Sequence, residues 1–230
     1  MNCRQIILAL LCLCALVLLF ACRSRFASKK SVEDRVRQYG QAARTRLKPD
    51  FARLGLVYPP ARVVLAAFKS ERMLEVWVGA ESGSLQFLRS YPILAASGGI
   101  GPKLRQGDRQ VPEGLYRIES LNPNSRYHLS LRLNYPNEAD RRLAAADGRT
   151  TLGGDIMIHG DNVSIGCLAM GDEAAEDLFV LAAETGIERI DVILSPVDFR
   201  VRELNGEPDG LPSWYPERCA ELRRALSGLK

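Results

Sequence analysis

A change in the spacing of apolar residues at Ala61 is the feature that most restricts the fold of this chain. After Tyr58-Pro59-Pro60 the period changes to two, in short runs rich in apolar residues that are typical of strands. Clusters of turn residues separate these runs, so we expect short strands joined by tight connections. The expected strands are 62–68, 73–78, 85–91, 93–96, 115–119, 127–133, 155–159 and 190–194.

Helical spacing occurs in three other places. Ser31 is a good N-cap for a first helix, which we expect to stop at Lys48-Pro49. A core helix follows from an Asp172 N-cap to Gly186, and a tail helix covers 216–229. We therefore predict a β-rich fold, mainly an antiparallel sheet, with one core helix and helical extensions at both ends.

The N-terminus predicts export rather than a part of the fold. The run from Ile6 to Ala21 carries no charge, is short for a membrane span, and suits the apolar region of an export signal. Leu19-Phe20-Ala21-Cys22 resembles the cleavage box of bacterial lipoproteins, in which the Cys is lipidated. An uncleaved anchor and a different cleavage site remain as alternatives. Each of them places the bulk of the protein outside the cytoplasm, in the periplasm or its equivalent.

These patterns divide the chain into four parts. We expect a leader or anchor at 1–22, a helical spacer at 23–60, a folded domain at 61–200 and a helical tail at 201–230. The spacer either packs on the domain or holds it away from the membrane. The formal net charge of +4 is close to balanced and gives no case for nucleic acid, which would require a clustered basic face, so we expect no nucleic-acid partner. Only Cys167 and Cys219 fall in the folded part, and we expect free thiols rather than a bridge between them.

The segment from His159 to Cys167 carries the candidate chemistry. A cysteine attacks as its thiolate, so it needs a group that takes its proton, and histidine suits that task near neutral pH. Gly160 and Gly166 leave room for a substrate, and the N–H groups of Gly166 and Cys167 could stabilise an oxyanion. Ser164 could bond within this loop or to the substrate. The alternative is a buried structural cysteine with a histidine hydrogen-bonded at a strand end.

Several ordered motifs resemble the L,D-transpeptidase (YkuD-type) catalytic domain. His-Gly at 159–160, Ser-x-Gly-Cys at 164–167 and Met170 resemble its active-site signature. The segment from Gly107 to Tyr116 is similar to an upstream family motif. Asn122-Pro123, the segment 133–137 and Gly153-Gly154-Asp155 resemble the shorter-loop, YafK-like branch. The resemblance covers residues 61–200 and implies a β-rich, barrel-like catalytic domain.

Three departures from the family pattern affect the site. Ile165 stands where most members have a second histidine, which leaves His159 as the base of the motif. Ala169 stands where most members have an arginine, so the contact that this arginine would supply is in doubt. The segment between the two halves of the signature is short, which would leave the acceptor side of the cleft more open.

The resemblance implies acyl transfer on peptidoglycan stem peptides, in cell-wall cross-linking or remodelling that affects cell shape. Cys167 would be the nucleophile and His159 the base, with no cofactor or metal; the acceptor would be an amine of a stem peptide or wall-linked protein. Lys103, Arg105 and Arg109 could meet stem-peptide carboxylates or belong to a solvated loop. His128 could be structural or contact the substrate.

Three other functions remain open at this point. A hydrolase of the same fold would use water as the acceptor. A noncatalytic wall-binding module would not need the His–Cys pair. A metal site built from His159, Cys167, Asp161 and His128 matches no closed zinc pattern.

Overall fold

The last strand in the sequence, β9 (Ile190–Ser195), lies in the interior of the sheet. The computed structural model describes residues 29–204 and 210–230, so the predicted leader at 1–22 lies outside the described residues. The strand order is β3-β2-β1-β9-β5-β6-β7-β8-β4. The pairs β1–β9 and β7–β8 are parallel and the other pairs are antiparallel, which confirms a β-rich, mainly antiparallel fold. The other strands are β1 (Arg62–Phe68), β2 (Met73–Gly79), β3 (Gln86–Pro92), β4 (Ala95–Ala96), β5 (Gly114–Ser125), β6 (His128–Leu133), β7 (Met157–His159) and β8 (Leu168–Ala169).

Strand β5 joins the two halves of the sheet. Its first residues, Gly114–Arg117, pair with β9, and its later residues pair with β6 after a register shift near Ile118. The first residues of β5 have no strand on the edge opposite β9. There the Asn134 side chain accepts the Arg117 N–H, and the Asn137 side chain donates to the Leu115 carbonyl. These side chains replace a strand partner, because an unpaired backbone group in the interior is costly.

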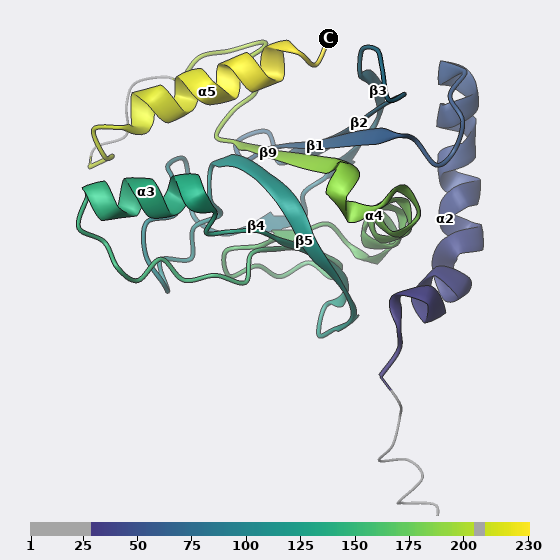
Figure 1. Cartoon of the computed structure of the whole chain (residues 1–230). Coiled ribbons are helices and arrows are strands. Elements are labelled where there is room, and N and C mark those ends of the chain that lie inside the picture. The colour runs from purple at the N-terminus through teal and green to yellow at the C-terminus, as the bar shows by residue number, and fades with distance from the viewer. Residues whose placement is uncertain (1–28, 205–209) are drawn as a thin grey trace, which may run out of the picture. The chain divides into compact units, whose positions relative to one another are not determined.

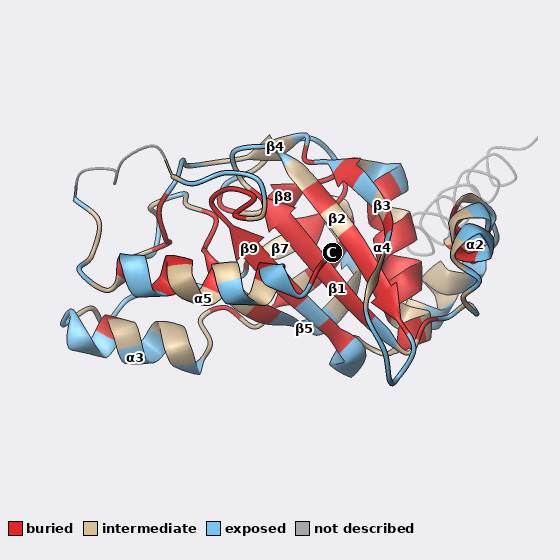
Figure 2. Cartoon of the chain, turned by 90° about the horizontal axis from the view of Figure 1, so that it is seen from above, coloured by how far each residue is buried: buried red, intermediate tan, exposed pale blue. Residues whose placement is uncertain are grey.

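Helices cover both faces of the central strands. Helix α4 (Asp172–Thr185) and helix α5 (Tyr215–Ser227) lie on opposite sides of β1 and β9 (Figure 1). Along β1, Val63 and Leu65 pack in the core that α4 shares, whereas Val64 and Ala66 pack in the core that α5 shares. Both faces of β1 are therefore buried (Figure 2).

Helix α2 (Val32–Leu54) packs against α4, and both belong to one compact unit from Ser31 to Lys230. The predicted Ser31 N-cap is confirmed, with Asp34 completing a capping box. The predicted stop at Pro49 is wrong, because the helix continues to a left-handed Gly55. A proline inside a helix costs about 3 kcal/mol, and burial of Phe51 in the turn that follows offsets it.

Three more elements differ from the sequence-based expectation. Helix α3 (Glu138–Ala146), capped by Asn137, was not predicted, and a 3₁₀ turn at Ile187–Arg189 precedes β9. Helix α4 begins after Gly171 without a side-chain cap, because the Asp172 carboxylate accepts the Asp161 N–H instead. No helix within residues 29–204 and 210–230 has the length and apolar character needed to cross a bilayer.

Candidate active site

His159 and Cys167 lie on adjacent parallel strands. His159 ends β7, Cys167 directly precedes β8, and the register pairs Ile158 with Leu168 and His159 with Ala169. Ile158 and Leu168 are buried in the core that α4 shares. Because side chains alternate along a strand, His159 and Cys167 face the opposite side of the sheet together. We call this side of β6, β7 and β8 the site face.

The His159 imidazole is held in one tautomer. Its side chain is buried, the Tyr127 ring packs against it with centroids 4.8 Å apart, and Nδ1 lies 2.6 Å from the Gly160 carbonyl oxygen. A carbonyl only accepts, so Nδ1 carries the proton and Nε2 of the neutral ring keeps its lone pair. Burial lowers the pKa of His159, although the Gly160 carbonyl and the Asp161 charge oppose the shift.

The Cys167 thiol is held by backbone groups of the strand beside it. Its Sγ donates to the Asp155 carbonyl oxygen at 3.6 Å. Burial raises the pKa of the thiol; the Asp155 charge adds to this, while the Met157 N–H and the Lys103 charge act against it. Burial therefore disfavours the charged form of both side chains.

The loop between the two residues is shaped by close backbone contacts. A Cβ on Gly160 would lie 2.6 Å from Asp172 Oδ1 and 2.9 Å from the Cβ of His128, so a larger residue would not fit. Gly166 has a φ of 107°, a conformation that favours glycine. The loop also places the Ile165 side chain in solvent, 73% exposed, so it does not replace the missing histidine.

The two amide N–H groups predicted to stabilise an oxyanion already donate hydrogen bonds to serine hydroxyls. The Gly166 N–H donates to Ser97 Oγ at 2.5 Å, and the Cys167 N–H donates to Ser164 Oγ at 3.2 Å. Ser164 Oγ in turn donates to the Cys167 carbonyl at 2.7 Å. Ser164 therefore stabilises the loop from within. The oxyanion role of the two amides stays a prediction, because both N–H groups would have to leave the serine hydroxyls before they could bind an oxyanion. Ser97 was not predicted from the sequence. Its position directly before Gly98-Gly99, at the start of the Gly-rich loop, was the one signal that could have indicated it.

Lys103 and His128 both make contacts within the protein. The Lys103 side chain is buried, and its ammonium bonds Asp108 at 2.5 Å inside the Gly-rich loop. His128 has a left-handed φ of 67°, and its Nε2 lies 3.0 Å from a carboxylate oxygen of Glu176 in α4. The substrate contacts considered for Lys103 and His128 stay predictions. Arg105 and Arg109 are exposed, and their roles stay predictions.

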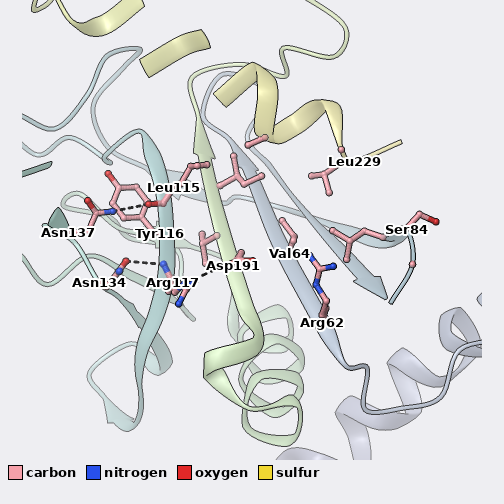
Figure 3. Close-up of a pocket in the computed structure, with 16 residues that line it drawn as sticks. Arg62, Val64, Ser84, Leu115, Tyr116, Arg117, Asn134, Asn137, Asp191 and Leu229 are labelled. Atoms are coloured by element: carbon pink, nitrogen blue, oxygen red, sulfur yellow. Dashed lines mark hydrogen bonds and ion pairs between the residues drawn. The ribbon is translucent and has the colours of Figure 1, made fainter. Parts of the chain in front are cut away.

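Neither cysteine of the described chain forms a disulfide: Cys167 is half-buried and Cys219 is buried in α5. Among residues 29–204 and 210–230, no group of three His, Cys, Asp or Glu side chains could hold a metal ion. A separate hollow of about 670 Å³ lies between α5 and the central strands (Figure 3). Arg117 and Asp191 form an ion pair at its polar end, and neither His159 nor Cys167 lines it.

Residues 62–192 match the YkuD family, described as the L,D-transpeptidase catalytic domain, and the chain belongs to this family. It is 43% identical over 119 residues to proteins named "Putative L,D-transpeptidase YafK" in Escherichia coli K12 and O157:H7. These matches cover 51% of this chain and 46% of each relative, so they span about half the length of both.

Solved structures of similar chains include the helical cell shape determining protein Pgp2 from Campylobacter jejuni. It has a TM-score of 0.49 and 20% identity, with 64% of this chain and 50% of that chain covered. L,D-transpeptidase 1 of Mycobacterium tuberculosis has a TM-score of 0.33 and 18% identity, with 58% of this chain and 62% of that chain covered.

Proposed function

We propose that this protein is a cysteine-dependent acyltransferase that acts on peptidoglycan stem peptides, as an L,D-transpeptidase. The observation that carries the proposal is the fixed tautomer of His159, whose Nδ1–H is bound to the Gly160 carbonyl. This leaves Nε2 as a base on the same face of the sheet as the Cys167 thiol. Membership of the L,D-transpeptidase catalytic-domain family supports the reaction class.

The reaction would run in two half-reactions. His159 Nε2 takes the Cys167 proton as the sulfur attacks the carbonyl carbon of an L,D peptide bond. The tetrahedral intermediate collapses to a thioester, the C–N bond breaks, and His159 returns the proton to the leaving amine. An acceptor amine then attacks the thioester, its proton passes to His159, and the Cys167 thiol leaves. Water in place of the amine would make the same chemistry a hydrolysis.

Mass spectrometry of muropeptides incubated with the purified protein tests this reaction. We expect new cross-links with the parent protein and none with Cys167→Ala, because removal of the sulfur prevents thioester formation. Cys219→Ala is the control, since that thiol is buried in α5 and should be dispensable for chemistry. Trimmed stems without cross-links would instead identify a hydrolase. Unchanged muropeptides with retained binding would identify a wall-binding module, and normal turnover by Cys167→Ala would overturn the proposal.

We also propose that the protein works outside the cytoplasm and is held at the membrane by its N-terminus. The uncharged run from Ile6 to Ala21 and the Cys22 that follows support this. Cys22→Ala should abolish incorporation of a labelled fatty acid if the lipoprotein reading is right. A mutant that is processed like the parent would favour an uncleaved anchor, and full-length native protein in the cytosol would contradict both.

A further inference from the structure

The turn between β5 and β6 places an aromatic ring against the base of the candidate site. Ser125 pairs with His128 at the end of the β5–β6 ladder, and Tyr127 is the second residue of the two-residue turn between them. The Tyr127 ring lies against the His159 imidazole, with centroids 4.8 Å apart and 31° between the ring planes. The Tyr127 N–H donates to Ser125 Oγ at 3.1 Å, which stabilises the turn. One face of the imidazole is therefore covered by a residue of this hairpin.

A bulge in β5, close to the turn, directs a backbone carbonyl to a partner outside the sheet. The β5–β6 register shifts between Asn122 and Ser125, where β5 carries one residue more than β6. Pro123 lies in this bulge. A proline has no N–H, so the carbonyl is its one backbone group that can form a hydrogen bond. Because a carbonyl without a partner is costly away from water, the hairpin is more stable when another element supplies a donor.

Helix α2 supplies that donor. Arg35 Nε donates to the Pro123 carbonyl oxygen at 2.8 Å. The same guanidinium donates from Nη1 to Gln38 Oε1 at 2.8 Å and lies 6.0 Å from the centre of the Tyr39 ring. These contacts within α2 hold the Arg35 side chain in the direction of the hairpin. The helix that the sequence predicts as a spacer is thus attached to the turn that covers His159.

The Tyr127 ring affects two properties that a general base needs. It restricts rotation of the imidazole, whose Nδ1 is bonded to the Gly160 carbonyl, so Nε2 keeps one direction. It also excludes water from one face, and burial is the largest cause that lowers the pKa of His159. The Asp161 charge opposes this shift, and the Cys167 thiol is a second titratable group on the site face. Loss of the Tyr127 ring should therefore loosen the imidazole and raise its pKa.

We propose that Tyr127 is a positioning residue for His159 and that Arg35 of α2 keeps the hairpin with Tyr127 in place. The proposal rests on the proposed function where it treats His159 as the base. Both residues act through the imidazole and form no bond with the substrate. The first helix of the folded unit would then belong to the catalytic apparatus.

NMR titration of the imidazoles in full-length Cys167→Ala protein tests the positioning role without catalysis. The chain has two histidines, and a His128→Ala variant assigns their signals. The Cys167→Ala background removes the thiol that would titrate together with the imidazole. We expect Tyr127→Leu to raise the pKa of His159 toward its ordinary value of 6.5, because water then reaches the ring. Tyr127→Phe should leave it unchanged, because phenylalanine keeps the ring.

An arginine pair on α2 tests the attachment of the hairpin. Arg35→Ala should shift the pKa of His159 in the same direction as Tyr127→Leu, although Arg35 binds Pro123 rather than the imidazole. Arg44→Ala is the matched control, since Arg44 lies on the same helix and pairs with Glu184 of α4 at 2.5 Å. A general loss of stability would not move this titration in the folded protein.

The titrations can overturn each half of the proposal. An unchanged or lowered pKa of His159 in Tyr127→Leu would overturn the role of Tyr127. An unchanged value in Arg35→Ala, or equal shifts in Arg35→Ala and Arg44→Ala, would overturn the role of Arg35.

Single-turnover thioester formation by proteins that retain Cys167 separates this proposal from the proposed function. Tyr127→Leu should slow the bond-forming step by about tenfold to hundredfold, as expected for a misplaced catalytic group, with the half-saturating concentration of stem peptide unchanged. A normal rate in Tyr127→Leu, in a protein whose parent forms the thioester, would overturn the positioning role alone. A parent that forms no thioester would overturn the proposed function, while the expected NMR shifts would still support the link from α2 to His159.

Discussion

At the scale of single residues, the two ring nitrogens of His159 have different surroundings. Nδ1 is committed to a main-chain oxygen at 2.6 Å, and Tyr127 covers the ring. Because the partner is a backbone carbonyl, no side-chain substitution removes it directly. The orientation of the base is therefore part of the loop geometry, and the glycine at 160 is required by the lack of space for a Cβ.

The chain offers a matched pair of histidines for testing the base. We expect His159→Ala to slow formation of the Cys167 thioester by about 10²–10⁴-fold, the usual contribution of general-base help. His128→Ala should change that rate little, because the His128 ring nitrogen is engaged by Glu176 of α4. Single-turnover reactions followed by intact mass measure both rates. Loss of the thioester in His128→Ala, with retention in His159→Ala, would show that the wrong histidine has been assigned.

The pH profile of acylation should reflect the buried position of the imidazole. Burial lowers the pKa of His159 below its ordinary value of 6.5, so the base stays unprotonated to a lower pH. We therefore expect the acidic limb of the rate profile to have its midpoint below 6.5. The measured value belongs to the His159–Cys167 pair. A midpoint well above 6.5 would mean that a thiolate–imidazolium pair is stabilised in the resting enzyme.

At the scale of elements, the Gly-rich loop between β4 and β5 is organised by one carboxylate. Asp108 accepts the N–H groups of Leu104, Arg105 and Gln110 and the ammonium of Lys103. Ser97, where the same loop begins, contacts the amide of Gly166. The loop is therefore a wall of the site whose conformation depends on Asp108.

Removal of the Asp108 charge should destabilise the protein in a pH-dependent way. Although burial opposes it, the hydrogen bonds from the Arg105 N–H and Lys103 hold the pKa of Asp108 below its ordinary range. This stabilisation is present above the unfolded pKa of about 4 and is lost as pH falls through the folded value. Asp108→Asn should lower the free energy of unfolding by about 1–2 kcal/mol at pH 7.

Urea denaturation at two pH values measures this effect. The difference between Asp108→Asn and the parent should shrink at a pH of about 2–3, where the parent carboxyl is also protonated. Asp191→Asn is the control, because its ion pair with Arg117 is exposed and should contribute under about 1 kcal/mol. A pH-independent loss in Asp108→Asn would mean that shape, rather than charge, matters at this position.

Strand positions could be predicted from the sequence because short apolar runs bounded by turn residues are a local signal. The expected strand at 62–68 and the Gly186 end of α4 are confirmed. The exit of α2 through Pro49 could not be predicted, because it depends on burial of Phe51 against distant strands. The two main residues of the candidate site could also be predicted, because His159 and Cys167 lie within one segment of nine residues. Ser97 was missed because only the folded chain brings its hydroxyl to the amide of Gly166, which is 69 residues away in the sequence.

At the scale of the whole molecule, a buried polar cluster joins α5 to the Gly-rich loop. The Tyr215 hydroxyl donates to Glu113 Oε2 at 2.7 Å. Glu113 Oε1 accepts from Lys69 at 2.9 Å and from the Gly101 N–H at 2.8 Å. The end of β1, the loop and the tail helix therefore meet at one carboxylate, so α5 is part of the folded unit rather than an appendage.

Tyr215→Phe should therefore destabilise the whole unit. It leaves one oxygen of a buried carboxylate without this donor, which should cost about 1–3 kcal/mol. Tyr135→Phe is the matched control: that ring is also buried, but its hydroxyl makes only long contacts of 3.4 Å to two carbonyls. Urea midpoints of the two variants and the parent give the comparison. Equal midpoints for Tyr215→Phe and the parent would show that water replaces the hydroxyl.

The interior position of β9 has a consequence for the timing of folding. Val63 of β1 pairs with Ile190 of β9, and β9 also pairs with β5, so this strand lies between β1 and β5 in the sheet. Contacts so distant in sequence form late. A chain that ends at Arg189 should thus stay sensitive to proteases, and protease resistance of that fragment would contradict this. We propose that the protein crosses a membrane N-terminus first. Late pairing of β9 would then keep the chain unfolded until nearly all of it has passed through the translocation channel.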